Sequence, residues 1–176
     1  MKKSLFIYQL FGFVFTGIVG VLLHFLFNWT NQSIIVAPFS AVNESIWEHM
    51  KLLFFPMFAF AILENHCIEN GYKSFWCVKL IGILMGISLI PIVYYTINKI
   101  FGNTPDWVNI LIFYTVSAIS YTVETRLLNN NTVNCKSPKM AIGILLLIVT
   151  VFVVLTFIPP EIPLFEDPIT KTYGLT

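Results

Sequence analysis

Five long apolar runs, separated by short polar connectors, dominate the hydropathy pattern of the chain. They occupy residues 5–27, 43–63, 75–97, 107–127 and 138–157. Each run is about 20 residues long, and a helix of that length matches the roughly 30 Å apolar thickness of a bilayer. The pattern therefore predicts an all-α fold, an integral membrane bundle of five transmembrane helices that forms one domain over residues 1–158.

The composition supports a membrane location and excludes several functions. The chain of 176 residues is 57% hydrophobic and 11% charged, whereas soluble domains carry about 25% charged residues. A net charge of +1 without a basic patch gives no reason to expect a nucleic-acid partner. No nucleophile elbow, P-loop or dinucleotide fingerprint occurs, so we expect no nucleotide cofactor, and the sequence leaves open whether the protein is an enzyme.

The distribution of cations predicts the orientation. Five spans put the two termini on opposite sides, and one side then holds seven cations while the other holds Lys51, Lys99 and Lys171. The seven are Lys2, Lys3, Lys73, Lys79, Arg126, Lys136 and Lys139. Because cytoplasmic loops are enriched in Lys and Arg, we expect the N-terminus in the cytoplasm and the C-terminus outside.

Two further features bear on location. Cys67, Cys77 and Cys135 fall at the predicted cytoplasmic ends, where thiols stay reduced, so we expect no disulfide. The abundance of Asn, Lys, Ile and Phe is typical of bacterial proteins and favours a bacterial plasma membrane.

The start of the second run concentrates ionisable side chains in a chain that has few of them. Residues 43–51 read NESIWEHMK and precede a wholly apolar stretch. Glu48, His49 and Lys51 are the catalytic candidates, with Glu48 as acid, base or ion-pairing group, Lys51 holding an anion and His49 assisting. The alternative is a helix start that carries an ordinary Glu48–Lys51 ion pair.

Other side chains at the same predicted external end are candidates for ligand binding. Asn43 is the expected N-cap of the second helix, and Glu44 and Trp47 are expected on the face that carries Glu48. The remaining candidates are His24, near the end of the first helix, and Asp167 in the tail.

Residues 159–176 form the predicted external tail. Four prolines stiffen it, and three apolar residues, Ile162, Leu164 and Phe165, favour docking on the bundle. We expect the tail to fold over the external mouth of the bundle as a lid.

Metal-binding spacings are absent from the sequence. There is no HExxH or CxxC motif and no pair of histidines four residues apart. Glu48 and His49 are adjacent on a helix and diverge, so they make a poor chelating pair. We therefore predict no metal site.

A polar stripe along the fourth helix suggests a second type of function. Tyr114, Tyr121 and Glu124 recur at helical spacing and could line a hydrated path through the bundle. The alternative is that Glu124 forms a salt bridge with Lys79 or Arg126 and that the tyrosines are anchored by hydrogen bonds. Pairs of glycines in the first and third helices offer close-packing faces, which would allow a homo-oligomer.

Two segments carry a resemblance to known proteins. One is the N-E-S-x-W-E-H-x-K pattern at residues 43–51, and the other is P-L-F-x-D-P at residues 163–168, followed by Tyr173 and Gly174. Together they resemble an uncharacterised family of small bacterial multi-pass membrane proteins. The resemblance implies a membrane location and no particular activity.

These observations lead to three functional hypotheses. The first is an outward-facing site that binds or acts on a small polar or lipid-headgroup ligand, with the bilayer and that unknown ligand as partners. The second is a small-solute or proton-coupled transporter that uses the stripe on the fourth helix. The third is an accessory subunit of a larger membrane complex.

Overall fold

The chain folds into five helices in the order that the hydropathy pattern predicts. The computed structural model describes residues 2–67, 72, 74–102 and 105–175, and no strand occurs in these ranges. The helices are α1 (Lys2–Trp29), α2 (Ile46–Cys67), α3 (Phe75–Phe101), α4 (Asp106–Asn130) and α5 (Pro138–Phe157). No helix end differs by more than four residues from its predicted position. Lys73, which was counted in the connector after α2, lies outside the described residues.

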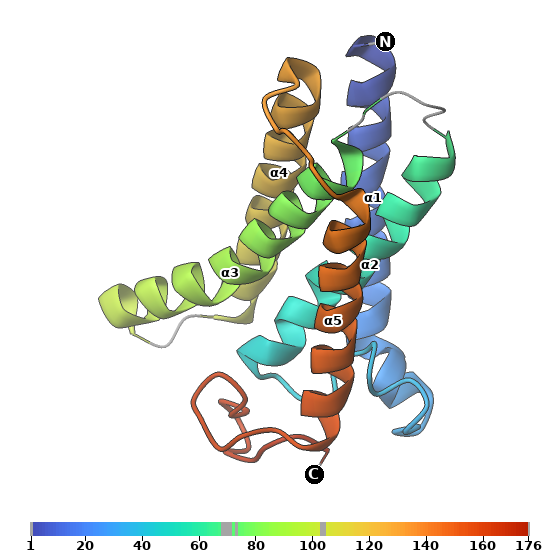
Figure 1. The fold of residues 1–176 in the computed structure, drawn as a ribbon. Coiled ribbons are helices and arrows are strands. Elements are labelled where there is room, and N and C mark those ends of the chain that lie inside the picture. The colour runs from blue at the N-terminus through green and yellow to red at the C-terminus, as the bar shows by residue number, and fades with distance from the viewer. Residues whose placement is uncertain (1, 68–71, 73, 103–104, 176) are drawn as a thin grey trace.

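The helices form an elongated bundle with its termini at opposite ends (Figure 1). The C-terminal tail lies at the end where α1 finishes and α2 begins, and we call this the tail end of the bundle. Helix α2 packs against α1 and α3, α4 packs against α3 and α1, and α5 packs against α3. The far half of α3 leans away from the other helices, and α4 then runs back toward the end of the bundle that carries the N-terminus (Figure 1).

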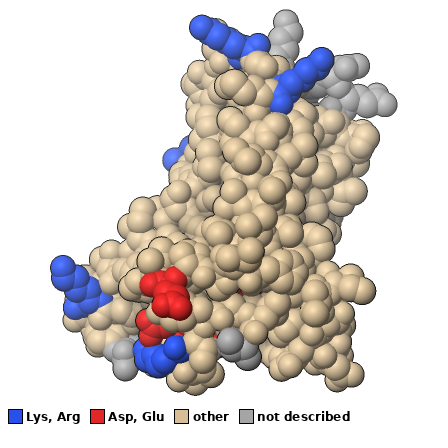
Figure 2. Space-filling view, turned by 60° about the horizontal axis from the view of Figure 1, so that its bottom comes forward, with Lys and Arg blue, Asp and Glu red and all other residues tan. Residues whose placement is uncertain are grey.

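Four helices are long and apolar enough to cross a membrane. Among the described residues these are α1, α2, α3 and α5. The buried fraction of the most apolar window is 72% for α2 but 22% for α5, so α2 is the inner helix and α5 presents most of its apolar surface outward. Such a surface suits lipid better than water. On the face seen in Figure 2, the long middle section is almost free of charged side chains, and the visible acidic side chains gather near the tail end.

Helix α4 does not meet the same criterion of length and apolarity. Three of its polar side chains, Ser117, Ser120 and Glu124, are fully buried. The outer face of α4 is mixed, with Ile110 and Ile119 exposed beside Thr122 and Arg126. Part of the polarity of α4 thus serves contacts inside the bundle.

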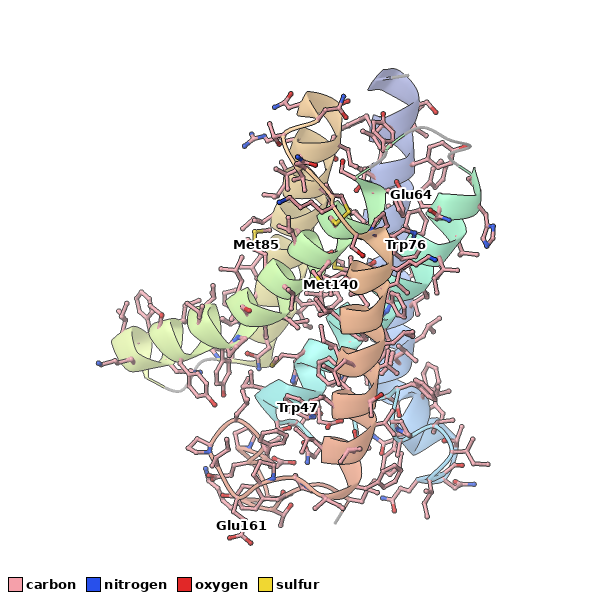
Figure 3. All side chains as sticks on the ribbon, in the orientation of Figure 1. Trp47, Glu64, Trp76, Met85, Met140 and Glu161 are labelled. Carbon is pink, nitrogen blue, oxygen red and sulfur yellow. A yellow bond between two sulfur atoms is a disulfide. The ribbon has the colours of Figure 1, made fainter. Side chains whose placement is uncertain are left out.

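The C-terminal tail packs on the beginning of α2. The ring of Phe165 stacks on Trp47 with 4.5 Å between the ring centroids, and Trp47 N donates a hydrogen bond of 3.0 Å to Leu164 O. An isolated antiparallel bridge between Glu166 and Tyr173 closes the tail into a loop. Figure 3 shows Trp47 at this end of α2 and Glu64 toward the opposite end.

The prediction that all three cysteines are free thiols is wrong for two of them. Cys77, in the first turn of α3, forms a disulfide with Cys135 in the connector before α5, and their Cα atoms are 5.8 Å apart. The pairing depends on the packing of α3 against α5 across 58 residues of sequence, which spacing alone does not reveal. Cys67 is free and exposed.

Candidate functional site

Helix α2 starts later than the sequence suggests, and this changes the site. The helix begins at Ile46, so Asn43 is not its N-cap. Ser45 Oγ instead accepts a hydrogen bond of 3.4 Å from Glu48 N, while Asn43 Oδ1 accepts one of 2.9 Å from Ser45 N. Because Asn43 closes a turn of its own, Glu44 lies outside the helix and does not share a helical face with Glu48.

Glu48 and Lys51 form a buried ion pair, and neither lines the cavity described below. Glu48 Oε2 lies 2.6 Å from Lys51 Nζ and also accepts a hydrogen bond of 2.9 Å from Val42 N. Lys51 Nζ donates to Ala37 O at 3.0 Å and to Thr156 Oγ1 at 2.9 Å. The residues are 2% and 0% exposed, so protein groups satisfy both charges. This geometry favours the alternative that the sequence left open, a structural ion pair.

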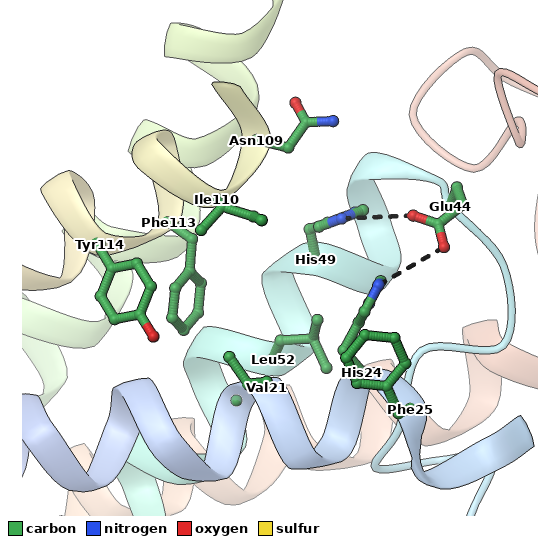
Figure 4. A pocket seen from close by; sticks show the side chains of 11 residues that line it. Val21, His24, Phe25, Glu44, His49, Leu52, Asn109, Ile110, Phe113 and Tyr114 are labelled. Atoms are coloured by element: carbon green, nitrogen blue, oxygen red, sulfur yellow. Dashed lines mark ion pairs between the residues drawn. The ribbon is translucent and has the colours of Figure 1, made fainter. Parts of the chain in front are cut away.

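Three other candidates converge at the tail end of the bundle. Glu44 Oε1 lies 3.7 Å from His24 Nε2, and Glu44 Oε2 lies 3.8 Å from His49 Nε2 (Figure 4). The two imidazole rings have centroids 5.7 Å apart. His24 comes from the last turns of α1, Glu44 from the connector, and His49 from the first turn of α2. Three segments therefore meet in one cluster, which we call the histidine–glutamate cluster.

This cluster forms the polar end of a cavity of about 210 Å³ between α1, α2 and α4. The remaining walls are mostly apolar and include Leu52 and Phe113. Val21, Phe25 and Ile110 also line the cavity, and they are 43%, 43% and 57% exposed. The cavity thus opens sideways onto the apolar flank of the bundle.

Asp167 holds the connector that carries Glu44. Its Oδ2 accepts a hydrogen bond of 3.3 Å from Glu44 N, and its Oδ1 accepts bonds of 2.7 and 3.1 Å from Ile169 N and Thr170 N. Burial alone would raise the pKa of Asp167, but these backbone donors stabilise the carboxylate and hold its pKa below its ordinary value. Asn43 Nδ2 adds a hydrogen bond of 3.1 Å to Gly174 O. Asp167 and Asn43 are therefore positioning residues, and neither lines the cavity.

The predicted residues of the α4 stripe lie in different surroundings. Tyr114 lines the cavity, whereas Tyr121 Oη and Thr16 Oγ1 are hydrogen-bonded at 2.8 Å inside the bundle. Glu124 and Glu64 both lie 2.5 Å from Lys79 Nζ, and all three are fully buried. The expectation that Glu124 pairs with Lys79 is met in the structure.

Sequence reasoning put His24, Glu44 and His49 at the same external site, but it did not predict that Glu44 lies between the two histidines. It predicted that Glu44 shares a helical face with Glu48 and that His49 points away from that face. It also missed Asn109 and Phe113, which line the cavity from the first turns of α4. Nothing in the sequence pairs the start of α4 with the end of α1, so no signal was available for these two.

The fold and the cavity define an all-helical protein whose helices are compatible with a membrane and whose tail end carries a partly polar cavity. The chain belongs to a family of unknown function (DUF6512), whose family model matches residues 2–175. No curated protein and no solved structure matches the chain.

Proposed function

We propose that this protein is a multi-pass membrane protein that binds an amphiphile in the cavity at its tail end. The polar group of the ligand contacts the histidine–glutamate cluster, and its apolar part lies against Leu52 and Phe113. The observation that carries the proposal is the cavity itself, which is mostly apolar and has two imidazoles and one carboxylate together at one end. Apolar pockets with a few convergent polar groups are the usual form of small-molecule sites.

The size and the opening of the cavity narrow the ligand class. Pockets for drug-sized molecules measure about 300–1,000 Å³, so a volume of about 210 Å³ suits a small molecule or one end of a longer one. The exposed rim residues Val21, Phe25 and Ile110 are apolar, which favours entry from the bilayer over entry from water. A single-chain lipid or another amphiphile dissolved in the membrane fits both observations.

A photoreactive fatty acid in vesicles that contain the full-length protein tests this function. Val21→Trp fills the mouth of the cavity, and Ile18→Trp is the matched control because Ile18 is exposed on the same helix and does not line the cavity. We expect saturable labelling of the wild type and of Ile18→Trp, with a large loss in Val21→Trp. Equal labelling of all three proteins would show annular lipid contact only and would refute the proposal.

The membrane arrangement is part of the proposal. We infer that α4 is the fifth span, that the N-terminus is cytoplasmic and that the tail end faces outward in a bacterial plasma membrane. The Lys and Arg residues outside the membrane spans support this orientation. The Cys77–Cys135 disulfide opposes it, because it lies at the end assigned to the reducing cytoplasm.

Proton-coupled transport is a second candidate, and the buried group of Glu64, Lys79 and Glu124 favours it. Ionisable residues inside membrane bundles are costly and often mark functional sites. Two carboxylates share one ammonium here, and each residue is at most 1% exposed. Proton flux into proteoliposomes, followed with a trapped pH dye, should then disappear in Glu124→Gln. Absence of flux in the wild type would remove this candidate.

A further inference from the structure

We infer that His24, Glu44 and His49 bind a divalent transition-metal ion of the zinc class, which provides the polar anchor of the cavity. This inference rests on the proposed function for the identity of the ligand that the metal would contact. Metal binding itself is independent of that ligand. The sequence predicts no metal site, because its spacing test considered Glu48 beside His49 and not Glu44 between two histidines.

The three donor atoms are close to the geometry that such an ion requires. One ligand atom from each side chain lies within 4.8 Å of the other two. In a tetrahedral zinc site with bonds of about 2.0–2.1 Å, neighbouring ligand atoms are about 3.3 Å apart. His24 Nε2 lies 3.7 Å from Glu44 Oε1 and His49 Nε2 lies 3.8 Å from Glu44 Oε2, each about half an ångström longer than that value. Closing the site therefore requires the two rings to move toward the Glu44 carboxylate and toward each other.

The histidine nitrogens are oriented for ligation. His49 Nδ1 lies 2.8 Å from Ser45 O, and because a carbonyl only accepts, the ring must donate its Nδ1–H. The neutral ring then has its lone pair on Nε2, which faces Glu44. A second hydrogen bond from the other ring nitrogen is the usual way in which proteins fix a metal-binding histidine. His24 also turns Nε2 toward Glu44, while its buried Nδ1 has no hydrogen-bond partner.

The local charge is also compatible with a bound cation, although the Glu44 side chain is 43% exposed. Glu44 brings a carboxylate into the cluster, and none of the described residues that line the cavity is Lys or Arg. Lys51 is occupied elsewhere, by Glu48 at 2.6 Å. A bound divalent ion would compensate the charge of Glu44 without any change in the fold.

The donor set selects the class of metal. Two imidazole nitrogens and one carboxylate suit Zn²⁺ and its neighbours in the first transition row, whereas Mg²⁺ and Ca²⁺ prefer oxygen ligands throughout. Three protein ligands leave one position of a tetrahedral ion open. The cluster is at one end of the cavity, so that position faces the space where the polar group of the ligand would lie. Asn109 Oδ1, a buried acceptor without a hydrogen-bond partner, also lines this cavity.

Equilibrium dialysis of the full-length, metal-stripped protein against Zn²⁺, after removal of any affinity tag, tests the inference. We expect one Zn²⁺ per chain in the wild type and binding weakened by about 100-fold or more in Glu44→Gln and in His49→Gln, because even groups that only support ligands contribute about 10–100-fold. His66→Gln is the matched control, since His66 is the remaining histidine and is exposed at the other end of α2. This variant should bind like the wild type.

The outcomes separate this inference from the proposed function. Loss of Zn²⁺ binding in His66→Gln, or unchanged binding in Glu44→Gln, would overturn the metal site. A ligand variant that fails to give a monodisperse protein is replaced by His24→Gln, whose side chain is 26% exposed and tolerates substitution better. Labelling with the photoreactive fatty acid is measured on metal-free protein, so a cavity that labels but binds no Zn²⁺ refutes the metal site alone.

Discussion

Removing the charge of Glu48 should destabilise the protein strongly. In Glu48→Gln the Lys51 ammonium stays fully buried but loses its carboxylate, and its remaining acceptors, Ala37 O, Thr156 Oγ1 and the amide oxygen that the substitution introduces, are all neutral. Breaking a buried ion pair from one side costs about 3–5 kcal/mol. For a chain of this size, about 2–4 °C of Tm corresponds to each kcal/mol, so we expect a decrease of about 6–20 °C.

Thermal unfolding in a mild detergent measures this effect, and two comparisons define its cause. The double variant Glu48→Gln/Lys51→Met removes both charges and should lose less than the two single variants added together, because no unpaired charge is left buried. Lys171→Met breaks the Glu166–Lys171 pair, in which the side chains are 30% and 68% exposed. An exposed ion pair contributes about 0–1 kcal/mol, so the Tm of Lys171→Met should be at most about 4 °C below that of the wild type.

An unchanged or higher Tm of Glu48→Gln would refute this reasoning. It would mean that Glu48 is held in unfavourable surroundings for a task, and the catalytic role predicted from the sequence would regain support.

Three further results are expected. Gly82→Ala should lower Tm by about 2–12 °C, because a Cβ at Gly82 meets the buried Glu124 side chain and overpacking costs about 1–3 kcal/mol. The control is Gly143→Ala, at a position with open space inside α5, where the higher helix propensity of Ala should raise Tm by about 2–4 °C. A membrane-impermeant maleimide should label Cys67 only in inverted vesicles, and labelling of intact cells would reverse the proposed orientation. Cys77→Ser should lower Tm by about 4–16 °C, since a disulfide contributes about 2–4 kcal/mol, and reductant should then affect the wild type but not the variant.

The helices were largely predictable because bilayer thickness and hydropathy act locally along the chain. Pro56 and Pro91 lie inside helices that continue past them, as the sequence reading of long apolar runs requires. The predicted start of α2 at residue 43 was the error that affected the site, because the helix begins at Ile46. Asn43, Ser45 and Glu44 are all acceptable near a helix start, and only the contacts of Asn43 with Ser45 and with the tail decide which residue begins the helix.

The residues of the candidate site and their common end of the bundle could be predicted, but the contacts between them could not. His24 and Glu44 are 20 positions apart, and their meeting depends on how the connector folds back over the end of α1. Asp167 fixes that connector through Glu44 N from 123 residues away. Long-range contacts of this kind follow from packing, as does the Cys77–Cys135 pairing, and the hydropathy pattern contains neither.

Mapping the photoreactive fatty acid by peptide mass spectrometry is the most direct test of the proposed binding site. If the amphiphile occupies the cavity, the label should be on α4 at Phe113 or Tyr114, as well as on α1 at Val21. Phe113 is 9% exposed and Tyr114 is partly buried, and both side chains line the cavity. An excess of unlabelled fatty acid should remove it from all three positions. Label confined to the outward residues of α1, such as Ile18 and Leu22, and insensitive to competition would contradict a binding site in this cavity.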